Sequence, residues 1–292
     1  MMPIIKLENE VLNVAVHTKG AELQSVFNQQ TGLEYMWSGD AAYWGKFSPV
    51  LFPIVGTLKN DTYFYNNKSY QLPRHGFARD MEFEVVHQEQ AAASFSITAT
   101  DATLAKYPFQ FQLLLHYSLV KNKLQLVYEV RNNGSTEMFF SIGAHPAFAV
   151  PLHITTAYND YQLKFNKEET ADRWPISKEG LIEALPTPLL QQTNILPLEK
   201  ALFHKDAIVL KALQSDTIRL CSDKTPNGWQ FEYADFPFMG IWAAKDADFV
   251  CIEPWCGIAD SVNTSQQLTE KEGINILAAG EVFKRSWSLS TW

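Results

Sequence analysis

Short segments rich in β-branched and aromatic residues recur along most of this 292-residue sequence, and they end at glycine, proline or asparagine. Such segments favour strands, because branched and aromatic side chains fit a pleated surface and the intervening residues favour turns. The sequence therefore predicts an all-β fold with an antiparallel meander. The predicted strands are residues 11–17, 82–87, 94–100, 111–119, 123–132, 207–210, 217–221, 229–233, 239–242, 249–253 and 282–289.

Three other stretches carry more local expectations. Residues 61–70 are predicted to form a hairpin, with Asn66 and Asn67 taking the positive φ of a tight turn. Residues 101–106 are predicted to form one helical turn, with Asp101 as its cap. Residues 157–197 contain four prolines and little regular alternation, so we expect an irregular, loop-rich excursion there.

Composition bears on domain organisation. Hydrophobic residues make up 46% of the chain and charged residues 19%, which is enough apolar material for a sizeable core. We find no linker, charge run, low-complexity tract or fixed-period repeat. The expectation is a single domain over residues 1–292.

The formal charge of -8 and the pI near 5.4 disfavour nucleic acid and anionic membranes as partners, since both require a basic surface. A neutral small molecule is the expected partner, and sheet edges allow a monomer or a homodimer. The first ten residues lack the pattern of a signal peptide, and the longest apolar run, residues 47–55, is too short to span a bilayer. Three cysteines without paired spacing fit reduced, buried and inert thiols, so a cytoplasmic location is expected.

Candidate reactive residues stand at three separate places, His75, His145 and Glu253. His145 and Glu253 each precede a proline, which favours an extended backbone at both. If residues 249–253 form a strand, Glu253 shares a face with Phe249 and Cys251. Burial there would raise the carboxyl pKa toward the range useful for a general base, and a histidine with a pKa near ~6.5 could exchange protons at the same pH.

Each of these residues also has a structural reading. His145 could be a hydrogen-bonded core histidine, and His75 could belong to a turn at Gly76. Glu253 is less easily explained as structural, because an acidic residue ending an apolar strand is costly unless it is paired or functional. Flat apolar side chains near these residues in sequence are suited to carry a sugar ring. They are Phe77, Phe148, Trp242 and Trp255.

Five motifs follow one another along nearly the whole chain. In this order they resemble the galactose mutarotase-like family, the aldose 1-epimerases, and more closely its LacX-like bacterial branch. The motifs are Gly20-Ala-Glu-Leu with Trp37 and Tyr43-Trp44, Leu51-Phe-Pro-Ile-Val-Gly56, Pro73-Arg-His-Gly-Phe-Ala-Arg79, Ser141-Ile-Gly-Ala-His-Pro-Ala-Phe148 and Ile252-Glu-Pro-Trp255.

The resemblance implies a large antiparallel β-sandwich with a sugar site on a concave sheet face. It assigns Glu253 as the general base for the anomeric hydroxyl and His145 as the general acid for the ring oxygen, with no cofactor and no metal. His75 matches a substrate-binding histidine, and Asp206 matches loosely an aspartate that holds sugar hydroxyls on a later strand. Relatives commonly carry arginine where this chain has Thr57, and Lys59, Arg74 or Arg79 are the candidates to replace it.

The leading hypothesis is therefore an aldose 1-epimerase acting on a free hexose. A hexose 6-phosphate is an alternative substrate, which requires converging basic residues such as Arg74 and Arg79. A sugar-binding protein without turnover is a further alternative, motivated by Thr57. His75, His145 and Glu253 also make a two-histidine, one-carboxylate set of the kind that binds non-haem iron, without any short ligand motif. A glycosidase requires a second facing carboxylate, for which the sequence offers no clear candidate.

Overall fold

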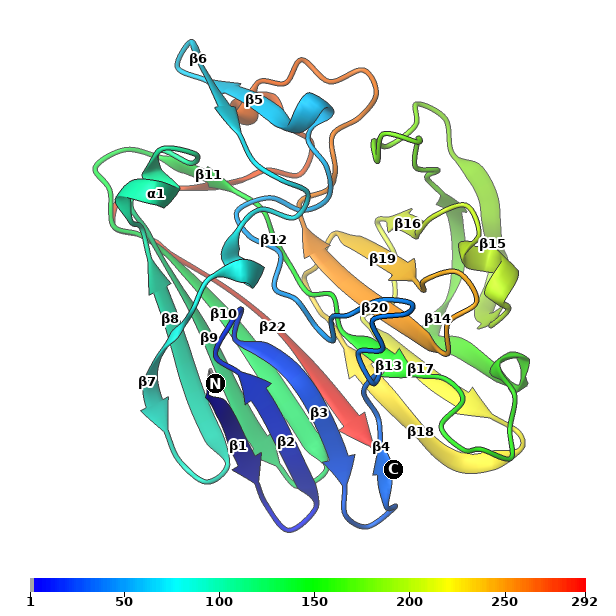
Figure 1. Cartoon of the computed structure of the whole chain (residues 1–292). Coiled ribbons are helices and arrows are strands. Elements are labelled where there is room, and N and C mark those ends of the chain that lie inside the picture. The colour runs from blue at the N-terminus through cyan, green and yellow to red at the C-terminus, as the bar shows by residue number, and fades with distance from the viewer. Residues whose placement is uncertain (1–2) are drawn as a thin grey trace.

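Antiparallel strands make up most of the computed structural model, which describes residues 3–292 (Figure 1). The largest sheet has nine strands, and each strand is hydrogen-bonded to its neighbours across the sheet. From one edge to the other they are β15 (Thr187–Pro197), β14 (Tyr161–Arg173), β17 (Thr217–Ser222), β18 (Thr225–Glu232), β22 (Val282–Thr291), β10 (Lys123–Asn132), β9 (Phe111–Val120), β8 (Ala92–Thr98) and β7 (Glu84–Gln88).

Two smaller sheets pack against this nine-stranded sheet. The four-stranded sheet contains β1 (Ile4–Glu8), β2 (Leu12–His17), β3 (Glu22–Asn28) and β4 (Leu33–Glu34). The five-stranded sheet contains β12 (Ile142–Gly143), β13 (Ala147–Ala149), β20 (Phe249–Cys256), β19 (Phe238–Trp242) and β16 (Ile208–Lys211).

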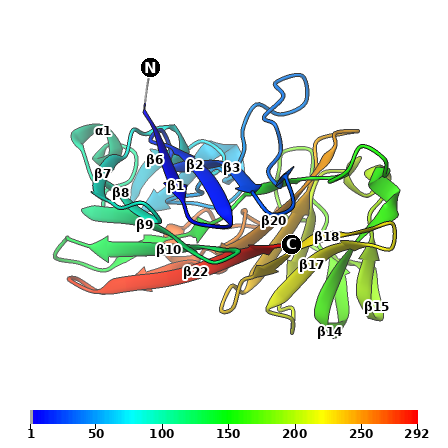
Figure 2. The ribbon, with the colours of Figure 1, turned by 90° about the horizontal axis from the view of Figure 1, so that it is seen from below.

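The layers form a sandwich with a shared core (Figure 2). Buried and half-buried residues alternate along β2, and its buried Val14 and Val16 belong to the same hydrophobic cluster as Leu113 and Leu115 of β9. Phe148 of β13 packs on Trp229 of β18, with ring centroids 4.6 Å apart. The expectation of an antiparallel β-sandwich is therefore confirmed.

The remaining regular elements are short. β5 (Thr62–Tyr65) and β6 (Lys68–Gln71) form the predicted hairpin, and Asn66 and Asn67 take φ values of 49° and 59°. β11 (Met138–Phe140) pairs with β21 (Asn275–Leu277). The helical segments are α1 (Asp101–Leu104) and the 3-10 turns Lys59–Asp61, Ala78–Asp80, Tyr158–Asp160, Lys200–Phe203 and Leu268–Glu270.

The prediction for residues 157–197 is wrong, because this stretch contains the long antiparallel pair β14 and β15. Alternation is present at the start of β14, where Tyr161, Leu163 and Phe165 are buried, but register shifts after Lys164 interrupt it. β15 is the outer strand of its sheet, where prolines are tolerated because one side of the strand has no pairing partner. Bulges and edge prolines together hid the strand pattern.

The cap of α1 is also one residue earlier than predicted. Thr100 is the N-cap, since its hydroxyl accepts a hydrogen bond from the Thr103 N–H and the Thr103 hydroxyl accepts one from the Thr100 N–H. Asp101 is instead the first helical residue, where a negative charge favours the helix N-terminus.

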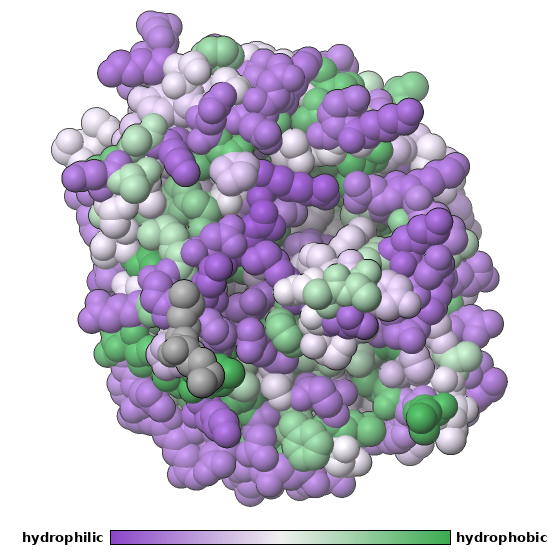
Figure 3. Space-filling view, in the orientation of Figure 1, coloured by the Kyte–Doolittle hydropathy of each residue, from purple (hydrophilic) through white to green (hydrophobic). Residues whose placement is uncertain are grey.

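The face seen in Figure 3 is predominantly hydrophilic, and its hydrophobic residues are scattered rather than gathered in one broad patch. The large apolar side chains that are exposed also come from separate parts of the chain, as Val120, Ile154 and Leu185 illustrate. Across residues 3–292, no helix has the length and apolar character needed to cross a membrane.

Candidate active site

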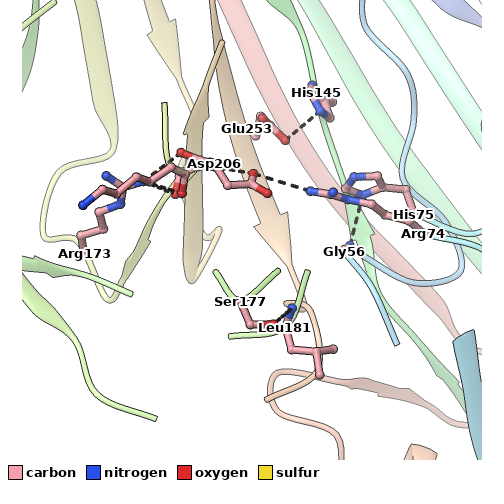
Figure 4. A network of polar contacts seen from close by, with 11 residues as sticks. Gly56, Arg74, His75, His145, Arg173, Ser177, Leu181, Asp206 and Glu253 are labelled. Carbon is pink, nitrogen blue, oxygen red and sulfur yellow. Dashed lines mark hydrogen bonds and ion pairs between the residues drawn. The ribbon is translucent and has the colours of Figure 1, made fainter. Parts of the chain in front are cut away.

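His145 and Glu253 face each other because the chain around His145 is hydrogen-bonded to β20. The Ala144 N–H donates to the Pro254 carbonyl at 3.1 Å, and the Ile252 N–H donates to the Pro146 carbonyl at 3.2 Å. His145 therefore lies between the two bonded residues of its own segment, and Glu253 lies between the two bonded residues of β20. His145 Nε2 consequently lies 3.4 Å from Glu253 Oε2, and both side chains are more than nine-tenths buried (Figure 4).

His75 reaches the same place on a backbone that is unusual for histidine, with φ at 68°. Its N–H donates to the Gly56 carbonyl at 2.8 Å, while its Nδ1 accepts from the Gly56 N–H at 3.1 Å (Figure 4). Because Nδ1 is the acceptor, the uncharged ring carries its proton on Nε2. Burial is the largest cause that lowers the pKa of His75 well below its ordinary value. His145, Arg74 and Arg79 lower this pKa further. His75 is thus a neutral donor beside His145.

A pocket of about 450 Å³ opens above these groups. Its polar lining residues are Arg74, His75, Arg79, His145, Asp206, Lys245 and Glu253. All five residues predicted to form the site, Glu253, His145, His75, Asp206 and Arg74, line this single pocket. The lining also includes apolar residues, among them Ile176, Ile182 and Val209. A lining with both polar and apolar residues suits a sugar ring, which has hydroxyls at its edge and C–H groups on its faces.

Aromatic side chains border His145 on two sides. Trp44 stacks on it with ring centroids 4.9 Å apart, and Trp242 meets it edge-on at 5.6 Å. Sequence reasoning gave Trp44 no role in the pocket, although the residue belongs to a motif of the family resemblance. Trp242 and Trp255 line the pocket as expected.

The expectation for the other two aromatic residues is wrong. Phe148 is directed into the core, where it packs on Trp229 and Phe231, and Phe77 packs on Phe111. Both are near the site in sequence, but their strand or turn positions aim the rings at the sandwich interior. Neither is among the pocket residues.

Asp206 lies in a turn just before β16, and its Oδ1 is 3.8 Å from Arg74 Nη2 (Figure 4). The family aspartate that it matches loosely lies on a strand, whereas Asp206 lies just before one; it does line the pocket. Of the three candidates to replace the arginine absent at Thr57, Arg74 and Arg79 line the pocket. Lys59 does not, since its ammonium donates to the Val262 carbonyl at 3.0 Å.

Burial favours the uncharged forms of both central groups. It raises the pKa of Glu253 well above its ordinary value, with Asp206 acting in the same direction and Arg74 and the Trp255 N–H opposing. Burial also lowers the pKa of His145 to about 3. The backbone of His145 itself opposes this shift, and Arg74 and Arg79 add to it. The expectation of an ordinary histidine pKa is therefore wrong. Burial thus favours the arrangement with a protonated carboxyl beside a neutral imidazole.

The residues that could hold a metal ion differ from the iron-binding set that the sequence offered as an alternative. Within residues 3–292, ligand atoms of His145, Cys251 and Glu253 lie within 4.8 Å of one another, and His75 is not part of this group. Cys251 lies beneath the pocket floor with its thiol protonated, because burial and Glu253 raise its pKa. Cys256 is also buried, whereas Cys221 is half-buried, so the prediction of three buried thiols is wrong at that position.

Glu253→Gln is expected to unfold at a temperature at least about 2 °C above the unchanged protein at neutral pH. The folded-state pKa of Glu253 is raised above the ordinary value of 4.5, so the unfolded chain releases this proton first as the pH rises. The unchanged protein therefore loses stability from about pH 4.5 upward until the folded-state pKa is reached. Glutamine does not ionise and avoids that loss. Calorimetric melting of both proteins between pH 4.5 and 7 should show the difference growing with pH.

Glu129→Gln is the matched control, because Glu129 of β10 is also buried but belongs to an ion-pair group. Burial raises its pKa, yet bonds from Lys284 and Arg131 outweigh burial and leave the pKa below its ordinary value. Its ionised form stabilises the fold, so Glu129→Gln should lower the melting temperature at neutral pH. Equal destabilisation by both substitutions would contradict the assignment of Glu253 as a carboxyl buried at a cost to stability.

Comparison with known protein families places the chain in a defined group. The family model described as Aldose 1-epimerase matches residues 3–289. The chain is 32% identical over 295 residues to the chromosomal LacX protein of Lactococcus lactis subsp. lactis, covering 98% of each sequence.

Solved structures agree with this match. A galactose mutarotase related enzyme from Lactobacillus acidophilus superimposes with a TM-score of 0.94 at 32% identity, covering 99% of this chain and 97% of that one. A galactose mutarotase-like protein from Lactobacillus casei ATCC 334 has a TM-score of 0.93 at 29% identity, covering 99% of this chain and 100% of the other.

Proposed function

The chain belongs to the aldose 1-epimerase family, and from that premise we propose that it interconverts the α and β anomers of a hexose by acid–base ring opening and reclosure. The observation that carries the proposal is the His145 and Glu253 pair, 3.4 Å apart at the floor of an open pocket. Two proton-transferring groups within reach of one sugar are what this isomerisation needs.

Glu253 and His145 divide the proton transfers between them. In ring opening, the Glu253 carboxylate takes the proton of the anomeric hydroxyl while protonated His145 gives a proton to the ring oxygen. The bond from C1 to the ring oxygen breaks, and C1 becomes an aldehyde. After rotation about the C1–C2 bond, the hydroxyl attacks the other face of the aldehyde. His145 then takes its proton back and Glu253 returns one to O1, so both side chains end as they began.

Burial of the pair favours the proton arrangement that is reached at the open-chain stage, in the middle of this cycle. Opening begins with ionised Glu253 and protonated His145, and it ends with both groups uncharged. The uncharged arrangement is the one that the buried site favours, since burial raises the pKa of Glu253 and lowers that of His145. The site thus favours the proton arrangement of the open-chain stage, while Arg74, which lowers the pKa of Glu253, favours the carboxylate needed to start.

The surrounding residues are suited to hold the sugar. We assign the Nε2–H of His75 as a donor to the substrate, because Gly56 fixes its tautomer. Asp206 and Arg74 offer an acceptor and a donor pair for ring hydroxyls, and Arg74 takes the role of the arginine that is absent at Thr57. Trp44 stacks on His145 and so holds the imidazole plane.

A hexose 6-phosphate is the second candidate substrate, and the cations of the pocket favour it. Arg74, Arg79 and Lys245 line the same pocket, and burial favours the uncharged form of Glu253 beside them. This excess of positive charge is suited to a phosphate group, which prefers guanidinium and ammonium donors.

The proposal is tested by magnetization-exchange NMR of the anomers of glucose, galactose and, separately, glucose 6-phosphate at neutral pH. Glucose 6-phosphate is measured against its own spontaneous rate. Exchange above the spontaneous rate with the free sugars supports the hexose assignment, and exchange confined to the phosphorylated sugar selects the second candidate. Calorimetric binding of a sugar without faster exchange would contradict turnover and leave a sugar-binding protein.

A further inference from the structure

Arg173, the last residue of β14, lies behind the loop that carries Asp206, on the side away from Arg74 (Figure 4). Its Nη2 donates to the carbonyls of Asp206 at 2.8 Å, Ala207 at 3.1 Å and Lys205 at 3.4 Å. Its Nη1 donates to the Leu202 carbonyl at 3.2 Å. One guanidinium therefore binds four carbonyls of residues 202–207, which we call the Asp206 loop.

The conformation of the Asp206 loop depends on outside support. Asp206 has φ at 74°, a left-handed conformation that a residue with a Cβ adopts at a cost. Its Oδ1 accepts from the Ala207 N–H at 2.7 Å, which offsets part of that cost and fixes the carboxylate direction. In this conformation the carboxylate lies between the two arginines, with Arg74 on the pocket side (Figure 4).

Arg173 differs from Arg74 in its relation to the pocket. Asp206 and Ala207 line the pocket together with Phe203 of the same loop, whereas Arg173 is not among the lining residues. Burial lowers the pKa of Arg173, and the nearby Asp206 opposes this shift. Any effect of Arg173 on a bound sugar must therefore pass through the loop.

We propose that Arg173 is a positioning residue that sets substrate affinity by holding the Asp206 loop and its carboxylate in the binding conformation. The inference rests on the proposed function, because it takes Asp206 as a ligand of the sugar. Lysine cannot replace this arginine fully, since an ammonium is a point charge and lacks the planar fork that reaches several carbonyls at once.

Arg173→Lys and Arg173→Met are the test variants. Hydrogen bonds from a charged group are strong enough that we expect about a 10-fold or larger rise in KM and in the sugar Kd for Arg173→Met. The rise should be smaller for Arg173→Lys, and kcat should stay within about 3-fold, since His145 and Glu253 are untouched. Arg219→Lys is the matched control, because Arg219 of β17 lies over Trp292, away from the pocket residues. A loss of kcat at unchanged KM would overturn the proposal.

A double-mutant cycle separates positioning from simple stabilisation. If Arg173 acts through Asp206, the variant carrying both Arg173→Met and Asp206→Ala should bind sugar no more weakly than Asp206→Ala alone. Additive losses, or a lower melting temperature with unchanged KM and Kd, would overturn the proposal. Should Arg173→Met fail to fold, the cycle is run with Arg173→Lys.

The same experiments distinguish failure of this inference from failure of the proposed function. If the unchanged protein binds hexose without faster anomer exchange, turnover is wrong, and the role of Arg173 is still decided by the Kd values of the cycle. If it exchanges anomers and the Arg173 variants behave as the Arg219 control does, only the positioning role is wrong. Absence of both binding and exchange in the unchanged protein overturns both.

Discussion

Replacing Glu253 with glutamine is expected to lower kcat for anomer exchange by about 10³-fold, the middle of the range for a positioned acid or base. The amide has nearly the same shape as the carboxyl, but it cannot take a proton from the anomeric hydroxyl or return one. Glu253 is 2% exposed, so water has little room to replace it. The contact with His145 would keep the side chain in place, which makes this a loss of chemistry rather than of geometry.

Saturation curves from exchange NMR, together with calorimetric Kd values, check this result. The Kd for the sugar should change by less than about 10-fold, and a measured melting temperature at or above that of the unchanged protein would exclude unfolding as the cause. Glu129→Gln, which removes a buried carboxylate elsewhere, should keep kcat near that of the unchanged protein. A Glu253→Gln rate within about 3-fold of normal would remove Glu253 from the catalytic assignment.

Replacing His145 with asparagine should lower kcat by at least about 10²-fold, the second largest effect expected. Asparagine can donate a hydrogen bond from its amide, but it cannot carry a proton to the ring oxygen and recover it on reclosure. The substitution also removes the ring that stacks on Trp44 at 4.9 Å. We therefore expect a moderate rise in KM in addition to the loss of kcat.

His87→Asn is the control for this substitution, because His87 lies exposed on β7 at the far edge of the nine-stranded sheet. The rates are measured by the same exchange experiment, with circular dichroism to verify the fold. Normal kcat in His145→Asn would contradict its role as the acid. Normal rates in both His145→Asn and Glu253→Gln would rule out the acid–base mechanism as a whole.

Much of the site could be predicted from the sequence, because neighbouring residues restrict the backbone conformation of its key residues. A proline after His145 and another after Glu253 favour extended backbone at both, and the structure places both on or between strands. The strand prediction for residues 249–253 also put Cys251 and Glu253 on one face, in agreement with their close ligand atoms. Which segments would meet came from the family resemblance, since spacing in sequence does not give pairing in space.

Other parts of the site had no local signal. Arg173 ends a strand whose alternation is interrupted by register shifts, so neither its strand nor its contact with the Asp206 loop was predicted. Phe77 and Phe148 were assigned to the pocket by nearness in sequence, but the turn at Phe77 and the strand position of Phe148 direct both rings into the core. Trp44 reaches His145 from a loop about a hundred residues away, a contact that no sequence period encodes.

Local sequence preferences were enough to predict many of the short strands, the Asn66-Asn67 turn and the extended backbone beside the two prolines. These features depend on steric preferences and side-chain alternation within a few residues. The order of the strands, the meeting of His75, His145 and Glu253, and the direction of their pKa shifts arise from tertiary packing instead. Burial and pairing depend on atoms that come from distant parts of the chain, so a pKa near ~6.5 assumed for an isolated histidine falls to about 3 for His145 in the folded protein.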